Sequence, residues 1–163
     1  MTHVDTELLP ILIENSRHSN ADLARMLNRS EAAISESIQR MLDQGIIRRF
    51  SVVIDEDLID GTPVKALVEL SIRPEKDTGY DAIAQTIHRY PNVVSHYLVS
   101  GKYDFLVVVS GKDHRDIAHF VFDKLATIEN VVSTTTHFIF KAYKEHGVVM
   151  GKPDVADRVP LIP

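Results

Sequence analysis

Apolar residues in the first third of the chain recur at helical spacing. Between Asp5 and Gln44 they fall three or four positions apart, the spacing that brings side chains onto one face of a helix. They form three groups: Leu8, Leu9, Leu12 and Ile13, then Leu23, Met26 and Leu27, then Ile34, Ile38, Met41 and Leu42. The pattern therefore predicts three short helices.

Residues typical of helix ends separate these groups. Ser19 or Asn20 can cap the second helix and Ser30 the third, because their side-chain oxygens accept hydrogen bonds from free backbone N–H groups. Gly45 marks the end of the third helix, since glycine readily adopts the left-handed conformation that is common there.

Pro10 falls inside the first group of apolar residues. Proline has no N–H to donate and is tolerated in the first turn of a helix, where that group would have no partner within the helix. We therefore expect this helix to begin at Asp5 or Thr6, which places Pro10 near its first turn.

Beyond Gly45 the pattern changes to that of strands. Branched residues dominate Ile46–Asp55, which predicts a strand, and Asp55–Pro63 is typical of a connection. The rest of the chain then follows the order β-α-β-β-α-β. The predicted strands are Val64–Ile72, Val93–Val99, Tyr103–Ser110 and Val131–Lys144, and the predicted helices are Asp81–Tyr90 and His114–Ile128.

This order is that of a ferredoxin-like module, which predicts an antiparallel sheet with both helices on one face. Phe138, Phe140 and the apolar run Val107–Val109 leave few polar positions for the other face. We therefore expect a second copy of the chain to cover that face with its own sheet, which makes the protein a homodimer or a larger oligomer.

Taken together, the patterns predict an α+β fold in two domains. A helix-turn-helix, winged-helix-like domain occupies residues 1–50, and a strand with a linker follows over 51–63. A ferredoxin-like domain that serves oligomerisation occupies residues 64–150, and 151–163 form an irregular C-terminal arm.

Composition narrows the class of protein. The chain has 163 residues, of which 44% are hydrophobic and none is cysteine, so it can bury a core but has no disulfide or thiolate metal site. The N-terminal MTHVDTELLP lacks the basic start and apolar core of a signal peptide, and the apolar runs are too short to span a bilayer. We therefore expect a cytoplasmic protein without a membrane partner.

The eight histidines raise the question of a metal or catalytic site. His114 and His119 are five residues apart, so on one helix they face different sides, and no His-Glu-x-x-His spacing occurs. The chain also lacks a Gly-rich phosphate loop and a Gly-x-Ser-x-Gly elbow. We expect no catalytic site, no bound metal and no cofactor.

The second and third predicted helices are spaced as in a helix-turn-helix, whose second helix enters the major groove of double-stranded DNA. The apolar stripe of the third helix directs Glu31, Ser35, Ser37 and Arg40 toward its exposed sides. We expect base contacts from Ser35 and Gln39, and further contacts to DNA from Ser30 and Glu31. The expected phosphate contacts come from Arg29, Arg40, Arg48 and Arg49.

The net negative charge of residues 1–60 opposes tight binding to DNA. Residues 1–60 hold six arginines and eleven acidic residues, whereas the remainder is neutral with twelve of each sign. A carboxylate such as that of Glu31 or Glu36 can accept a hydrogen bond from cytosine N4, but it repels phosphate. We therefore expect a modest salt dependence, because few phosphates are neutralised per copy.

The order of all these parts is specific. A helix-turn-helix, a segment beginning GIIRRF, a linker, a ferredoxin-like domain with the loop SGKYDFLV, and a last strand ending FKAYKEHGVV follow one another. Over about residues 5–150 this arrangement resembles the leucine-responsive regulator and asparagine-synthase regulator family, Lrp/AsnC. The resemblance implies a transcription regulator that dimerises through its C-terminal sheets, often assembles into octamers, and binds a small effector, usually an amino acid, between dimers.

The family's effector pocket uses a Gly-x-Tyr-Asp loop, and the matching residues here are Gly101, Lys102, Tyr103 and Asp104. The resemblance implies that loop amides bind the ligand carboxylate and an acidic group its ammonium. Residues of the last strand approach the pocket in the family; here they are Ser133, Thr134, Thr135 and Thr136. Both features also have ordinary explanations, a hairpin turn with Gly101 at positive φ and the β propensity of threonine.

Two other functions remain open. Sirohaem decarboxylase subunits resemble Lrp/AsnC proteins, and the segment IIRRF with His96 is faintly similar to theirs; where they carry a Trp-Pro-Tyr-Asn type segment, this chain has Gly-Lys-Tyr-Asp and no tryptophan. A stand-alone effector sensor with weakened DNA binding is the other. Family members commonly carry arginines near positions 36 and 37, where this chain has Glu36 and Ser37.

Overall fold

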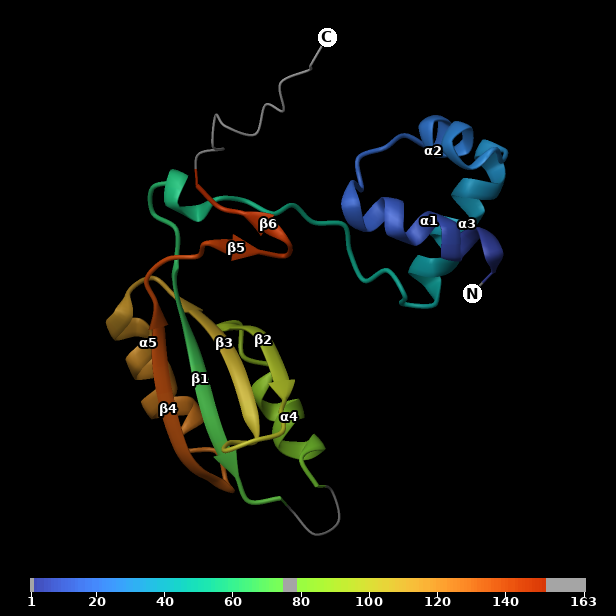
Figure 1. Cartoon of the computed structure of the whole chain (residues 1–163). Coiled ribbons are helices and arrows are strands. Elements are labelled where there is room, and N and C mark those ends of the chain that lie inside the picture. The colour runs from blue at the N-terminus through green and yellow to red at the C-terminus, as the bar shows by residue number, and fades with distance from the viewer. Residues whose placement is uncertain (1, 75–78, 152–163) are drawn as a thin grey trace. The chain divides into compact units, whose positions relative to one another are not determined.

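The structure is a computed structural model that describes residues 2–74 and 79–151. Its contacts divide the chain into two compact units, Met1–Val53 and Ile54–Pro163 (Figure 1). The expected C-terminal arm, 151–163, lies outside the described residues except for Gly151.

The N-terminal unit is built from helices α1 (His3–Glu14), α2 (Asn20–Leu27) and α3 (Glu31–Asp43), as the helical spacing predicts. The predicted caps are confirmed: Ser19 Oγ accepts from the Asp22 N–H at 3.1 Å, and Ser30 Oγ from the Ala33 N–H at 3.2 Å. Gly45 has a φ of +67° just after α3, in the left-handed region. The buried side chains that join the helices are Leu8, Leu12, Leu23, Ala24, Ile34, Met41 and Ile47.

The start of α1 differs from the prediction. The helix begins at His3, because Thr2 caps it: the Thr2 side chain accepts from the Asp5 N–H, and the Asp5 carboxylate accepts from the Thr2 N–H. Pro10 therefore lies in the helix interior, and its expected place near the first turn is wrong. Because Pro10 is exposed, its ring faces solvent while the buried face of the helix stays packed.

The predicted strand Ile46–Asp55 is also wrong. Ile47 is buried beneath the helices, but residues 48–55 have no sheet partner within the described part of the chain, and Phe50, Val52 and Val53 are exposed. A strand requires a neighbour that accepts and donates its backbone hydrogen bonds. Branched composition alone does not supply that neighbour.

The C-terminal unit has the predicted ferredoxin-like order. Its elements are β1 (Val64–Ile72), α4 (Asp81–Ile87), β2 (Val93–Leu98), β3 (Phe105–Gly111), α5 (His114–Phe120), a π-helical turn (Val121–Leu125) and β4 (Val131–Ile139). The strands lie in the order β2-β3-β1-β4 and every neighbouring pair is antiparallel, which confirms the predicted sheet.

Both helices cover the same face of this sheet, as predicted (Figure 1). Alternate residues of the two central strands point into the core on that face, since successive strand side chains face opposite ways. The core consists of Ala66, Val68, Leu70 and Ile72 from β1, Phe105, Val107 and Val109 from β3, and Ile83, Ile87, Ile117, Phe120, Val121 and Leu125 from the helical segments.

The opposite, open face of the sheet is more polar than expected. Phe138 packs on the helix side, Phe140 lies beyond β4 and is 87% exposed, and Val107 and Val109 belong to the core. The register instead places other side chains on the open face, which include Lys65, Leu67, Glu69, Tyr97, Leu106, Val108, Ser133, Thr135, His137 and Ile139. The expected contribution of Phe138 and Phe140 to this face is therefore wrong, and the apolar surface available to a covering sheet includes Leu67, Tyr97, Leu106, Val108 and Ile139.

The last strand ends at Ile139 and not at Lys144. Lys65 pairs with Ile139, and β1 begins one residue earlier, so a longer β4 would have no neighbour. The chain instead forms a hairpin of β5 (Lys144–Glu145) and β6 (Val148–Val149). His146 and Gly147 both have positive φ, as a tight two-residue hairpin turn requires.

One half-buried histidine, which packs on the core, gives the C-terminal unit a predicted dependence on pH. The His96 ring packs against Phe105 with centroids 4.5 Å apart, and burial, aided by the nearby His88, lowers the pKa of His96 below its usual 6.5. The unfolded chain therefore takes up a proton that the folded unit resists, so stability is full above pH 6.5 and falls as the pH drops below it. We expect His96→Leu to flatten this fall between about pH 7 and pH 5.

Tyrosine fluorescence during urea unfolding measures this effect on the intact protein. All five tyrosines lie between Tyr80 and Tyr143, and the chain has no tryptophan, so the signal reports the C-terminal unit alone. His119→Gln, on the exposed side of α5, is the control and should keep the wild-type slope. An equal pH slope in His96→Leu and wild type would contradict the assignment.

Candidate DNA-binding helix and effector loop

Helix α3 has a buried side and an exposed side. Ile34, Ser37 and Met41 are buried. The residues on the exposed side line a shallow surface hollow: Ala32, Ser35, Glu36, Gln39, Arg40, Asp43 and Gln44. Ser35 and Gln39 lie there as expected, although the Gln39 side-chain amide donates to the Asp43 carboxylate at 2.8 Å.

The expectation that Ser37 lies on an exposed side of α3 is wrong. The residue is fully buried, and its hydroxyl donates to the Asp5 carboxylate at 2.5 Å. The Asp5 side chain is itself fully buried. A buried carboxylate needs such donors, because leaving water without them costs several kcal/mol, on the order of 2–7 for a neutral polar group and more for a charge.

Arg40 is the second partner of this carboxylate. A guanidinium nitrogen of Arg40 lies 2.6 Å from Asp5 and 3.1 Å from the Thr2 hydroxyl, and another lies 3.8 Å from Glu36. Arg40, then Ser37 and the Thr2 N–H, hold the pKa of Asp5 well below its usual range. Because its guanidinium is engaged within the unit, we expect Arg40 to order α3 and not to hold a phosphate.

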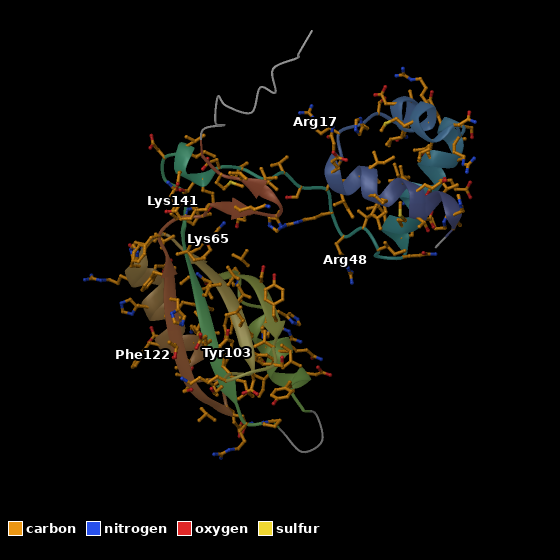
Figure 2. All side chains as sticks on the ribbon, in the orientation of Figure 1. Arg17, Arg48, Lys65, Tyr103, Phe122 and Lys141 are labelled. Carbon is orange, nitrogen blue, oxygen red and sulfur yellow. The ribbon has the colours of Figure 1, made fainter. Side chains whose placement is uncertain are left out.

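The other expected DNA contacts lie around the ends of α3. Ser30 is its N-cap and Glu31 occupies its exposed first turn. Arg29 lies 3.3 Å from Glu7 and is partly exposed. Arg48 and Arg49 follow the helix and are exposed; Figure 2 shows Arg48 extending from the ribbon into solvent.

The loop between β2 and β3 carries the expected effector residues. Gly101 has a φ of +143°, so the predicted positive φ is confirmed, and Lys102 is exposed. Tyr103 is half-buried and precedes β3, which begins at Phe105 and not at Tyr103 as predicted.

Asp104 fastens this loop to the central strand. Its N–H donates to the Leu70 carbonyl at 3.0 Å, and its carboxylate accepts from the Ile72 N–H at 2.7 Å and from the Tyr80 hydroxyl at 2.9 Å. The hydrogen bond to Asp104 raises the pKa of Tyr80, with a smaller contribution from burial. Tyr80 is not among the residues predicted for this site, since no spacing links it to the loop.

The four hydroxyl residues of β4 divide between the two faces of the sheet. Ser133 and Thr135 are exposed on the open face, whereas Thr134 and Thr136 are half-buried on the helix side. Ser133 pairs with Ser71, next to the Ile72 amide that binds Asp104. The start of β4 and the loop therefore lie at the same end of β1, while Thr136, opposite Val68, lies farther along.

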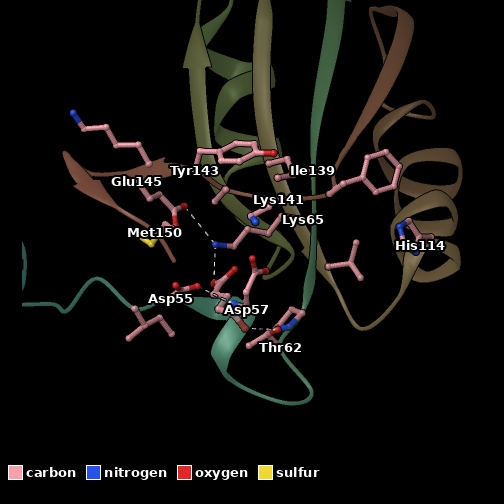
Figure 3. Close-up of a pocket in the computed structure, with 17 residues that line it drawn as sticks. Asp55, Asp57, Thr62, Lys65, His114, Ile139, Lys141, Tyr143, Glu145 and Met150 are labelled. Carbon is pink, nitrogen blue, oxygen red and sulfur yellow. Dashed lines mark hydrogen bonds and ion pairs between the residues drawn. The ribbon is translucent and has the colours of Figure 1, made fainter. Parts of the chain in front are cut away.

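A second hollow, of about 590 Å³, lies near the opposite end of β1 (Figure 3). The Lys65 ammonium lies 2.8 Å from Glu56 and 3.6 Å from Glu145. Burial lowers the pKa of Lys65, but the two carboxylates more than offset this and leave the pKa above its usual value. These ion pairs join the 3-10 helix (Glu56–Leu58) and the hairpin to β1, so the Lys65 ammonium is already engaged within the unit.

A helix-turn-helix followed by a ferredoxin-like sheet is the architecture of a DNA-binding regulator with a ligand-binding domain. Comparison with known families agrees: residues 1–48 match the winged helix-turn-helix DNA-binding family, and residues 65–149 match the Lrp/AsnC ligand binding domain. The chain belongs to the Lrp/AsnC family of transcriptional regulators.

Individual relatives support this membership. The chain is 38% identical to the uncharacterized HTH-type transcriptional regulator YugG of Bacillus subtilis, over 100% of this chain and 99% of the relative. It is 31% identical to the HTH-type transcriptional regulator LysM of Saccharolobus solfataricus, over 85% and 93%.

Solved structures share the fold. The transcriptional regulator NMB0573/L-Met complex of Neisseria meningitidis matches with a TM-score of 0.70 and 25% identity, over 89% of this chain and 93% of that one. E. coli AsnC matches with a TM-score of 0.68 and 23% identity, over 89% and 95%. Separately, residues 2–74 and 79–151 contain no helix long and apolar enough to cross a membrane.

The buried contact between α1 and α3 leads to a prediction. Asp5→Asn keeps the size of the side chain but removes the charge that Arg40 faces, so it should destabilise the N-terminal unit selectively. Circular dichroism at the helix minimum should show melting at lower temperature. Tyrosine fluorescence, which reports the other unit, should be unchanged.

Glu14→Gln, at the exposed end of α1, is the matched control and should melt like wild type. Equal helix melting of Asp5→Asn and wild type would contradict the role given to the Asp5 carboxylate.

Proposed function

We propose that this regulator binds a specific operator through paired α3 helices and that an amino acid modulates this binding. The observation that carries the proposal is the exposed face of α3, which presents Ser35 and Glu36 and is followed by two exposed arginines, Arg48 and Arg49. Because its target is chromosomal DNA, the protein acts in the cytoplasm of its cell.

In this proposal α3 lies in the major groove, as the second helix of a helix-turn-helix does. Ser35 and Gln39 contact base edges, while Ser30 and Glu31 lie at the helix end that enters the groove. Arg29, Arg48 and Arg49 bind phosphates on either side of the groove and set the register of the protein on the duplex.

The effector site is proposed at the loop Gly101–Asp104. An α-amino acid can place its carboxylate on the loop amides and its ammonium on Asp104, whose oxygens each accept one described hydrogen bond and retain further acceptor capacity. Ser133 and Thr134 lie nearest this end of the sheet, with Thr135 and Thr136 beyond. The relative solved with L-Met supports an amino acid as the class of effector.

Two copies of the chain are proposed to pair through the open faces of their sheets, covering Leu67, Leu106 and Val108, and the dimers to assemble further, up to octamers. The effector then acts by binding one assembly more tightly than another. A ligand shifts such an equilibrium only through its differential affinity for the two states.

Binding to DNA tests the proposal directly. The purified protein is titrated onto its own upstream DNA and onto a scrambled duplex at several salt concentrations, with and without a mixture of amino acids. Selective binding that the amino acids alter is the expected result. Ligand binding without any DNA binding at low salt would instead favour a stand-alone sensor, and a tetrapyrrole absorbance band would favour the decarboxylase.

The arginines after α3 give a second prediction. Arg48→Ala combined with Arg49→Ala should weaken binding to operator and scrambled DNA alike, because phosphate contacts carry no sequence information. The slope of log affinity against log salt should fall by about 1 for each phosphate that the variant no longer neutralises. Arg115→Ala, exposed on α5, is the control. Unchanged affinity in the double variant would remove both arginines from the interface.

Asp104 gives a third prediction. Asp104→Asn keeps an oxygen for the Ile72 N–H but removes the charge that an ammonium group requires, so the response of DNA binding to amino acids should disappear. Analytical ultracentrifugation should show the same oligomer as wild type. Asp123→Asn, exposed on the π-helical turn, is the control; a full amino-acid response in Asp104→Asn would exclude Asp104 from the pocket.

A further inference from the structure

Glu36 occupies the centre of the exposed face of α3. Its side chain is 80% exposed. At about 100° per residue, it points roughly opposite to the packed residues Ile34, Ile38 and Met41. Glu31 lies within about 80° of that packed side by the same geometry, so of the two glutamates Glu36 is the one aimed away from the body of the unit.

A chain of polar contacts links Glu36 to the interior of the N-terminal unit. Arg40 reaches from the buried Asp5 carboxylate, 2.6 Å away, to the Glu36 carboxylate, 3.8 Å away on the next turn. Ser37, the residue directly after Glu36, donates to the same Asp5 carboxylate and so fixes the rotation of α3 about its axis. Arg40 also balances part of the charge that would repel phosphates.

The exposed face of α3 carries two carboxylates, Glu36 and Asp43, which can only accept hydrogen bonds. One N–H of the Gln39 amide already donates to Asp43, and Ala32 offers only a methyl group. Acceptors select donors, and in the major groove the donors on base edges are the amino groups of cytosine and adenine. Adenine N7, an acceptor beside its amino group, repels a carboxylate, so cytosine is the better match.

We propose that Glu36 determines operator specificity by accepting a hydrogen bond from the N4 amino group of a cytosine, and that Arg40 is a positioning residue for it. This inference rests on the proposed function, in which α3 enters the major groove. Glu36 weakens binding to DNA in general, because its charge repels phosphates, and only a matched cytosine recovers that loss. The residue therefore acts by rejecting wrong sequences as much as by binding the right one.

Selection from a random duplex library, followed by sequencing, tests the proposal on the intact protein. Wild type should enrich half-sites that share a cytosine at one position. Glu36→Gln should change that position to adenine, since glutamine pairs with adenine N6 and N7, and keep the rest of the site. The cytosine preference should drop by about 5- to 150-fold, which corresponds to one good base contact, while binding to scrambled DNA should become tighter.

Two further variants separate the role of Glu36 in reading the base from the role of Arg40 in positioning Glu36. Glu14→Gln, at the exposed end of α1 and outside the proposed DNA contacts, is the matched control and should select the wild-type site. Arg40→Lys keeps a charge for Asp5 but cannot bridge to Glu36 with a planar fork, so it should relax the preference at the cytosine position alone. Loss of preference at every position in Arg40→Lys would reduce Arg40 to a structural role and overturn its part of the proposal.

The results for wild type and Glu36→Gln show whether this inference fails alone or fails together with the proposed function. If both proteins enrich the same half-site, Glu36 does not read the base and the inference is overturned, while the operator-binding regulator stands. If wild type enriches no sequence at all, the proposed operator binding fails and the inference fails with it.

Discussion

The Asp5 carboxylate is the contact on which the DNA-binding unit depends. It is buried at the start of α1 and accepts hydrogen bonds from the Thr2 N–H, the Ser37 hydroxyl and the Arg40 guanidinium. A charge in such a place is strongly destabilising if any partner is removed, because it has left water. The carboxylate therefore fixes where α1 begins and how α3 is turned, and through α3 it decides which side chains can face DNA.

The C-terminal unit depends in the same way on its central strand, β1. It pairs with β3 on one side and β4 on the other, and its alternate residues fill the core beneath α4 and α5. Polar side chains attach other segments near both ends of β1. Asp104 accepts a hydrogen bond from the Ile72 N–H near one end, and Lys65 pairs with Glu56 and Glu145 near the other. The loop Gly101–Asp104 and the hairpin are thus both attached to the same strand.

Hydrophobic spacing was sufficient to predict the helices, the ferredoxin-like order and β1 with its observed bounds. It could not predict that Ser37 is buried or that Arg40 is engaged, because a polar residue becomes a core residue only through a partner distant in sequence, here Asp5. The same limit explains the absent strand at 46–55 and the shortened β4, since branched residues form a strand only beside another strand. Tyr80 could not be predicted for this reason too, as its link to Asp104 exists only in three dimensions.

The acidic charge of residues 1–60 argues against binding to DNA. It becomes compatible with binding if the Glu36 carboxylate, at the centre of the exposed face of α3, accepts a hydrogen bond from a base. The most direct measurement is a crystal structure of the intact protein bound to its selected operator, with the distance from Glu36 to the nearest base edge as the decisive quantity. The account predicts α3 in the major groove and a Glu36 oxygen within hydrogen-bond distance, about 2.7–3.2 Å, of a cytosine N4. A complex in which α3 lies outside the groove, or in which Glu36 faces solvent, would contradict it.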